Sequence, residues 1–181
     1  MKKTLIINFF GAPGSGKSTG AAYLFSQLKM AGIDCEYVHE FAKDLVWQNH
    51  KEVFENPENQ YFIGANQFFR MNSLLGKVDV IVTDSPLLLS VIYNKSIFLD
   101  QKYNSFIIDL FKSRLNGFNL LVNRNKDYNP NGRNETQEEA AEIHDKIVNL
   151  LNDNNIGYEV IDGSPYYYRI VVQKILEQIR G

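Results

Sequence analysis

Apolar and polar positions follow two patterns along the chain. Five short runs are strand-like, and one of them, residues 78–83, is almost continuously apolar, which is typical of strands inside a parallel sheet. In the longer segments between them, apolar residues recur every three or four positions, as on one face of a helix. The predicted strands are residues 5–10, 35–39, 78–83, 118–123 and 158–161, and the predicted helices are residues 17–31, 40–50, 58–76, 103–115, 135–154 and 166–180.

The alternation of strands and helices predicts the fold class. Parallel strands joined by right-handed helical crossovers form a doubly wound α/β sheet with helices on both faces. We therefore expect a three-layer α/β/α fold around a five-stranded parallel sheet, with ligands at the carboxyl ends of the strands. The 181 residues contain no internal repeat and no interdomain linker, so residues 1–181 are expected to form one domain.

The segment after the first strand carries the most specific motif. Its sequence, Gly11-Ala12-Pro13-Gly14-Ser15-Gly16-Lys17-Ser18, matches the P-loop pattern GxxxxGK[ST] at every fixed position. Glycines let the backbone amides approach phosphate oxygens, and the next helix N-terminus favours an anion. Lys17 is predicted to reach the β- and γ-phosphates and Ser18 to ligate Mg²⁺, so the predicted cofactors are ATP and Mg²⁺. The predicted nucleotide-binding residues are Gly11, Gly14, Ser15, Gly16, Lys17, Ser18 and Thr19.

Asp84 ends the third predicted strand, where a P-loop protein places a second residue that orients Mg²⁺. A second interpretation is that Asp84 caps a helix beginning near Pro86. The next residue is Ser85, whereas many P-loop ATPase motors carry a water-activating glutamate there. The GTPase signature N-K-x-D is also missing, since residues 125–128 read Asn-Lys-Asp-Tyr. These features favour a phosphotransferase over a dedicated hydrolase or a GTP switch.

Glu40 follows the second predicted strand and is the first candidate for a catalytic base. Strand ends of a parallel sheet share one edge, so Glu40 is expected to face the same crevice as the P-loop. A carboxylate there is suited to take a proton from an acceptor hydroxyl. The alternative is a solvated glutamate in the first turn of a helix, where the helix dipole favours it. Asp44, one turn later, is the reserve candidate.

Composition and charge narrow the class of protein. With 44% hydrophobic and 22% charged residues the chain is globular, and its net charge of −2 disfavours a general nucleic-acid coating protein. The one cysteine, Cys35, excludes an intrachain disulfide and favours a reducing, cytoplasmic compartment. The short apolar run at the start leads directly into the P-loop, so we interpret it as a strand and not as a signal peptide. No membrane span is expected.

Together, these motifs resemble those of the small P-loop nucleoside, nucleotide and polynucleotide kinases. The chain is most similar to phage-encoded kinase-like P-loop proteins and to the ribosylnicotinamide-kinase domain of bacterial NAD-pathway regulators. The resemblance covers nearly the whole chain as an order of motifs, and its specific part is the P-loop. It implies transfer of the γ-phosphate of ATP to a hydroxyl or phosphate of a nucleoside, nucleotide or nucleic-acid acceptor, including a modified base or strand end in DNA. A phage origin would place the protein in the host cytoplasm.

The resemblance also implies roles for residues outside the P-loop. Glu40 matches the acidic residue that acts as a base or binds the acceptor hydroxyl, and Gln67 and Arg70 match a glutamine and an arginine that face the acceptor. The alternative for the latter two is the polar face of an ordinary helix. Deoxynucleoside kinases usually carry an arginine shortly after the third-strand aspartate, and residues 84–87 lack it. The acceptor therefore stays open.

A lid is expected at about residues 124–137, after the fourth strand. Kinases of this kind close an arginine-bearing lid over ATP, and Arg124 and Arg133 are the matching cations here. A guanidinium group can neutralise the charge of the transferring phosphoryl group, and closure excludes water. The alternative is a solvated surface loop. A different function class also stays open, a nucleotide-dependent ATPase or switch that acts through a protein partner.

Overall fold

Five parallel strands form one sheet in the computed structural model, which describes residues 3–98, 100–125 and 136–180. The order across the sheet is β2-β3-β1-β4-β5, and every neighbouring pair is parallel. The strands are β1 (Leu5–Phe10), β2 (Cys35–Val38), β3 (Val80–Thr83), β4 (Phe118–Asn123) and β5 (Glu159–Asp162). The predicted α/β class and five-stranded parallel sheet are confirmed.

Each predicted helix is present, with ends that differ by a few residues. The helices are α1 (Lys17–Met30), α2 (Phe41–Trp47), α3 (Glu52–Glu55), α4 (Gln60–Asn72), α5 (Leu89–Ile92), α6 (Asp100–Leu110), α7 (Gln137–Asp153) and α8 (Pro165–Arg180), with a 3₁₀ turn η1 (Pro57–Asn59) and a π turn η2 (Phe111–Leu115). The predicted helix 103–115 comprises most of α6 together with η2. Three short elements, α3, η1 and α5, were not predicted, because four residues or fewer are too short to show a helical period.

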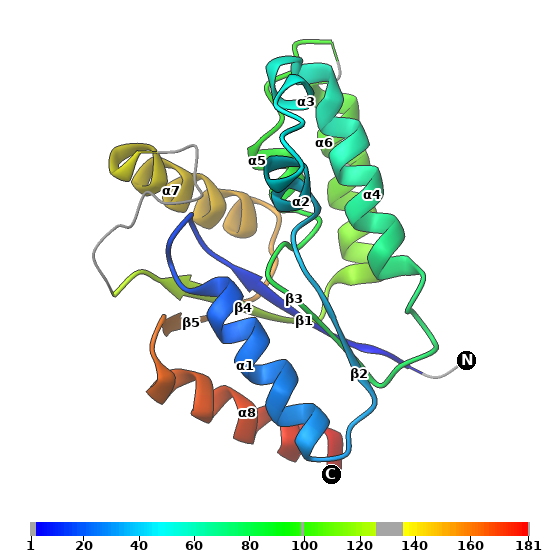
Figure 1. The fold of residues 1–181 in the computed structure, drawn as a ribbon, viewed down its shortest axis with the longest axis vertical. Helices are drawn as coiled ribbons and strands as arrows, with labels where there is room; N and C mark the ends of the chain where they lie inside the picture. Colours follow the sequence, from blue (N-terminus) through cyan, green and yellow to red (C-terminus); the bar gives the residue numbers. More distant parts are fainter. Residues whose placement is uncertain (1–2, 99, 126–135, 181) are drawn as a thin grey trace.

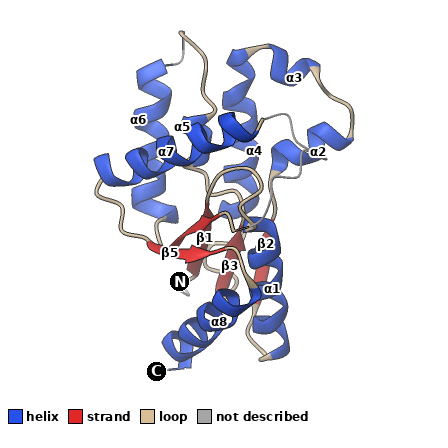
Figure 2. Ribbon diagram, turned by 90° about the vertical axis from the view of Figure 1, so that its left-hand side faces the viewer, coloured by secondary structure: helices blue, strands red, loops and turns tan. Residues whose placement is uncertain are grey.

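Helices cover both faces of the sheet. Helices α1 and α8 pack together on one face, and α4 to α7 lie on the other, as Figures 1 and 2 show from two sides. One buried apolar cluster, including Leu24 and Ile175, fills the α1/α8 face, and a second cluster, including Met71 and Phe111, fills the opposite face. Burial on both faces is the reason for the continuous apolar strands in the sequence. No helix among the described residues combines the length and apolar character needed to cross a membrane.

One polar pair interrupts the apolar core. Asn8 of β1 is fully buried, and its Nδ2 donates to Asn119 Oδ1 at 2.9 Å and to the Leu115 carbonyl at 3.0 Å. Asn119 in turn donates from Nδ2 to the Gly157 carbonyl at 2.9 Å. These bonds connect β1 to β4 and to the turn before β5, which explains why a polar residue stands within the first strand.

The register of the strands brings three loops to one edge of the sheet. Thr83, the last residue of β3, pairs with Asn8 of β1 on one side and with Val38 of β2 on the other. The residues that follow these strands therefore emerge side by side, with Asp84 between the P-loop and Glu40. This edge carries the candidate site.

Candidate functional site

The P-loop between β1 and α1 has the backbone of an anion-binding loop. Gly16 has φ +103°, in the left-handed region, and a Cβ built on it would lie 2.5 Å from the Tyr168 hydroxyl. The position thus requires glycine. Lys17 Nζ donates to the Ala12 carbonyl at 2.9 Å, which holds the ammonium group over the loop.

Tyr168 of α8 holds the P-loop in place through a hydrogen bond to its backbone. Its hydroxyl donates to the Gly16 carbonyl at 2.9 Å, and the residue is only 3% exposed. Burial raises the pKa of Tyr168 to about 12, so the phenol keeps its proton and stays a donor. Gly163 approaches the Ser15 carbonyl so closely that a Cβ would collide with it. The P-loop is therefore held between α1 and the start of α8, a contact that no local sequence pattern signals.

A cleft of about 780 Å³ begins at the P-loop and extends between the helices above it. Its lining unites predicted residues from four separate segments: Gly14, Gly16, Lys17, Ser18, Thr19, Glu40, Gln67 and Asp84. Its farther half is lined mainly by apolar side chains of α2 to α5 and α7, including Val46, Ile63, Ile92 and Ile143. One continuous cleft thus contains a phosphate-binding loop and, beyond it, a second compartment lined by apolar side chains together with polar ones.

Other predicted residues do not line the cleft. Gly11 and Ser15 lie beneath the surface of the P-loop, and the Ser15 side chain is buried. Arg124 directly follows β4 at the same edge of the sheet but is not part of the lining. Arg133 and most of the predicted lid, residues 124–137, lie outside the described residues. The lid stays a prediction.

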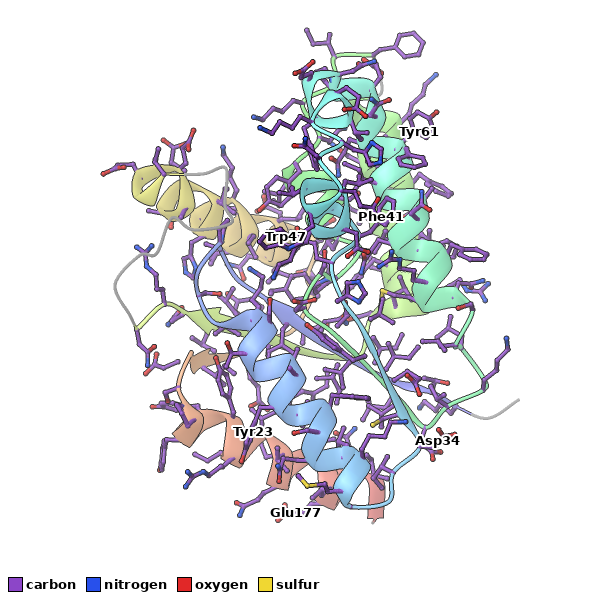
Figure 3. The ribbon with its side chains drawn as sticks, viewed as in Figure 1. Tyr23, Asp34, Phe41, Trp47, Tyr61 and Glu177 are labelled. Atoms are coloured by element: carbon purple, nitrogen blue, oxygen red, sulfur yellow. The ribbon has the colours of Figure 1, made fainter. Side chains whose placement is uncertain are left out.

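Arg70 of α4 contacts α2 and does not line the cleft. Its Nη2 donates to Asp44 Oδ2 at 2.7 Å, and its guanidinium group stacks over the Phe41 ring at 4.8 Å (Phe41 is labelled in Figure 3). Partial burial alone would raise the pKa of Asp44, but hydrogen bonds from Arg70 and His39 outweigh burial and lower the pKa below its ordinary value. Arg70 therefore ties α4 to α2, and Asp44 is engaged outside the cleft.

Gln67 presents a buried donor to the cleft. Its Oε1 accepts a hydrogen bond from the Phe41 backbone N–H at 2.9 Å, which fixes the start of α2 and orients the amide. Its Nε2 is buried without a hydrogen-bond partner, and the residue is 4% exposed. A buried donor without a partner is destabilising by about 1–3 kcal/mol, so a ligand that supplies an acceptor atom here gains that amount.

Asp84 is buried at the base of the cleft and lies near a residue that the sequence did not indicate. The carboxylate is 3% exposed, and Oδ1 has no hydrogen-bond partner. Burial, followed by the charge and hydrogen-bonding influence of Asp84, raises the pKa of Tyr37, so the phenol near this carboxylate keeps its proton. Asp84 is not a helix cap, since α5 begins only at Leu89.

The residues present fit a magnesium ion. Mg²⁺ prefers hard oxygen ligands and binds through one or two protein groups together with substrate phosphates. The Ser18 hydroxyl and the unpartnered Asp84 Oδ1 are such oxygens and share one cleft. No group of three or more His, Cys, Asp or Glu side chains suited to a metal occurs within the described part of the chain.

We expect Tyr37→Phe to weaken divalent-ion binding several-fold, because the Asp84 carboxylate loses its neighbouring phenol, a polar group that can orient a metal ligand. Titration of Mn²⁺, followed by electron paramagnetic resonance with a non-hydrolysable ATP analogue present, measures the affinity directly. Tyr23→Phe is the matched control, since Tyr23 is a half-buried tyrosine of α1 that packs on Tyr168. Equal Mn²⁺ affinity in both variants would show that Tyr37 does not position Asp84.

The comparison with protein families agrees with this geometry. A model of the family described as "AAA domain" matches residues 6–166, which is 161 of the 181 residues. The match runs from β1 to the first turn of α8 and so includes the P-loop and all five strands. No curated protein matches the chain significantly.

Proposed function

Because the chain belongs to the AAA domain family and has a P-loop for nucleotide binding, we propose that it is an ATP-dependent kinase acting on a nucleoside, nucleotide or nucleic-acid acceptor. The observation that carries the proposal is the second compartment of the cleft. ATP hydrolysis alone requires a phosphate loop and water, whereas phosphoryl transfer requires a place for an acceptor. Here that place adjoins the P-loop and is lined by Glu40, Gln67 and apolar side chains.

In this proposal the P-loop binds and orients the donor phosphates. Backbone amides from Gly14 to Ser18 surround them, and the Lys17 ammonium group stabilises the negative charge of the transferring phosphoryl group. Ser18 and Asp84 hold Mg²⁺, which when bound neutralises charge on the phosphates. Thr19 lies in the first turn of α1 and adds a hydroxyl on the same side of the cleft.

Glu40 is the proposed base. It lies at the start of α2 and lines the cleft on the acceptor side of the P-loop. Its carboxylate accepts the proton from the attacking hydroxyl, which then bonds to the γ-phosphorus as the bond to the ADP leaving group breaks. Ser85 in place of a glutamate after Asp84 leaves no second carboxylate at that position to activate water. Arg124 and Arg133 are proposed to add positive charge when the lid closes.

The acceptor compartment fits a planar ring. Val46, Ile63, Ile92 and Ile143 line it with apolar surface, and the Gln67 Nε2 donor meets the ring at its polar edge. A nucleobase combines an apolar face with hydrogen-bond acceptors at its edge. The compartment therefore supports a nucleobase-containing acceptor over a small polar alcohol.

An acceptor panel tests the proposal. We expect ADP formation from γ-labelled ATP to depend on an added acceptor, with the label transferred to a nucleoside, a nucleotide or an oligonucleotide. An ATPase or switch that acts through a protein partner would instead turn over slowly and show no response to any acceptor. One observation favours that alternative, the exposed Phe69 and Phe106 side chains at 71% and 62%, which a partner would cover. Acceptor-independent turnover would therefore overturn the kinase proposal.

A further inference from the structure

Trp47, the one tryptophan of the chain, lies exposed at the end of α2. Its relative exposure is 72%, so its ring is not packed in the apolar core, where a large aromatic side chain would contribute most to stability. Figure 3 shows it on the side of α2 away from α4. An exposed tryptophan ring offers a flat apolar face on which a ligand ring can stack favourably.

The helix places Trp47 beside the cleft. Residues four positions apart share one face of a helix, so Trp47 lies one turn from Lys43. Lys43 and Val46, the residue before Trp47, both line the cleft. Lys43 is exposed and has no ion pair or hydrogen bond among the described residues. Lys95, after α5, also lines the cleft and likewise has neither. Two ammonium groups thus line the cleft, and one exposed aromatic ring lies a helical turn from the first of them.

The described acidic residues that line the cleft form no ion pair with Lys43 or Lys95. Glu40 and Asp84 belong to the phosphoryl-transfer site at the base of the cleft. On α7, the Glu139 side chain accepts from the Thr136 backbone N–H, and Glu142 lies 3.9 Å from Lys146. Lys43 and Lys95 are thus two ammonium groups without an ion pair among the described residues of a cleft whose lining otherwise carries both signs of charge.

We propose, on the basis of the kinase function above, that the acceptor is a nucleotide within a single-stranded nucleic acid. Its base occupies the apolar compartment, the base of the adjacent nucleotide stacks on Trp47, and Lys43 pairs with the phosphate between them. A free nucleoside fills only the compartment and leaves Trp47 and Lys43 without a role. Aromatic stacking of successive bases beside a basic groove is the general way in which proteins bind single strands.

The net charge of −2 is compatible with a contact to only a few phosphates of a single strand. Two phosphate contacts, made by Lys43 and Lys95, predict a slope of about −1.4 for the logarithm of affinity against the logarithm of salt concentration, at about −0.7 per contact with single strands. A protein that coats long nucleic acids would show a much steeper slope. Lys43→Ala is expected to reduce the slope to about −0.7.

Fluorescence of the single tryptophan tests the proposal. A ten-nucleotide single-stranded DNA of mixed sequence is titrated into the full chain in the presence of a non-hydrolysable ATP analogue, beside an equimolar mixture of the four mononucleotides. We expect the oligonucleotide to quench Trp47 and the mononucleotides to leave its emission unchanged. Absence of quenching by the oligonucleotide would overturn the proposal.

Two variants separate the loss of base stacking on Trp47 from the effect of removing any exposed aromatic ring. Trp47→Ala is expected to weaken binding of a dye-labelled oligonucleotide by about 5- to 150-fold, the usual range for loss of one stacked base, with ATP affinity unchanged. Phe69→Ala removes an equally exposed ring of α4 outside the cleft lining and should have no effect. Equal losses in the two variants would overturn the inference.

Failure of this inference can be distinguished from failure of the kinase proposal. If label passes from ATP to mononucleotides or nucleosides as efficiently as to oligonucleotides, and Trp47→Ala changes neither rate, the kinase proposal stands and the single-strand inference fails. If no acceptor receives label, the kinase proposal fails and the inference fails with it.

Discussion

Lys17→Ala will remove most phosphoryl transfer, lowering kcat by about 100-fold or more. Loss of one preorganised charge or donor at a transition state typically reduces kcat by about 10²–10³-fold. Lys17 is well placed for this role, since it lines the cleft and its ammonium group is held over the P-loop by the Ala12 carbonyl. Steady-state transfer of labelled phosphate at saturating ATP measures the effect, and nucleotide affinity is determined separately by calorimetry.

The control for this variant lies on the same helix. Lys29 is near the end of α1 and pairs with Glu36 on the surface at 3.1 Å, far from the cleft lining. Lys29→Ala should leave kcat unchanged, because an exposed pair of this kind contributes little to stability. Near-normal transfer by Lys17→Ala, with the same thermal midpoint as Lys29→Ala, would mean that the P-loop is not where the donor phosphates bind.

Glu40→Gln will slow transfer by about 10²–10⁴-fold and leave ATP binding intact. The amide keeps the size of the side chain but cannot accept the proton of the acceptor hydroxyl, and general-base catalysis contributes about this factor. Because Glu40 lies after β2 and the P-loop after β1, the change should not disturb the phosphate loop. Single-turnover transfer and calorimetric ATP affinity, measured on the same preparation, separate the two effects.

Glu36→Gln is the matched control for Glu40→Gln. Glu36 is the nearest preceding glutamate, lies within β2 and pairs with Lys29 away from the cleft. It should transfer phosphate at the normal rate. If Glu40→Gln lost ATP affinity together with transfer, Glu40 would have a structural or metal-binding role and the base would have to be sought elsewhere.

The sequence predicted the strands and the P-loop because both depend on local constraints. Strands buried on both faces must be apolar at nearly every position, and a loop that wraps phosphate must have glycine where φ is positive, as at Gly16. The order of the strands was not predictable in this way. It depends on how β3 pairs between β1 and β2, and the apolar runs carry no information on pairing partners.

The candidate site was predictable where it follows from strand ends. Asp84 and Glu40 come directly after strands, and the structure brings both to the cleft beside Lys17. The roles of helical residues did not follow from the sequence in this way, because a long side chain such as Arg70 can extend to either side of its helix. Here Arg70 pairs with Asp44. The role of Tyr168 was not predictable, since its contact with Gly16 joins residues 152 positions apart.

The contact between Tyr168 and Gly16 has a consequence for the nascent chain. The nucleotide loop is translated well before Tyr168, the side chain that holds its carbonyl, because the two residues are 152 positions apart. Until α8 docks beside α1, the loop lacks this hydrogen bond, so we expect a chain without α8 to bind nucleotide more weakly. The nucleotide site is therefore completed only after α8 has been translated. A nascent chain arrested before α8 is expected to retain nucleotide poorly.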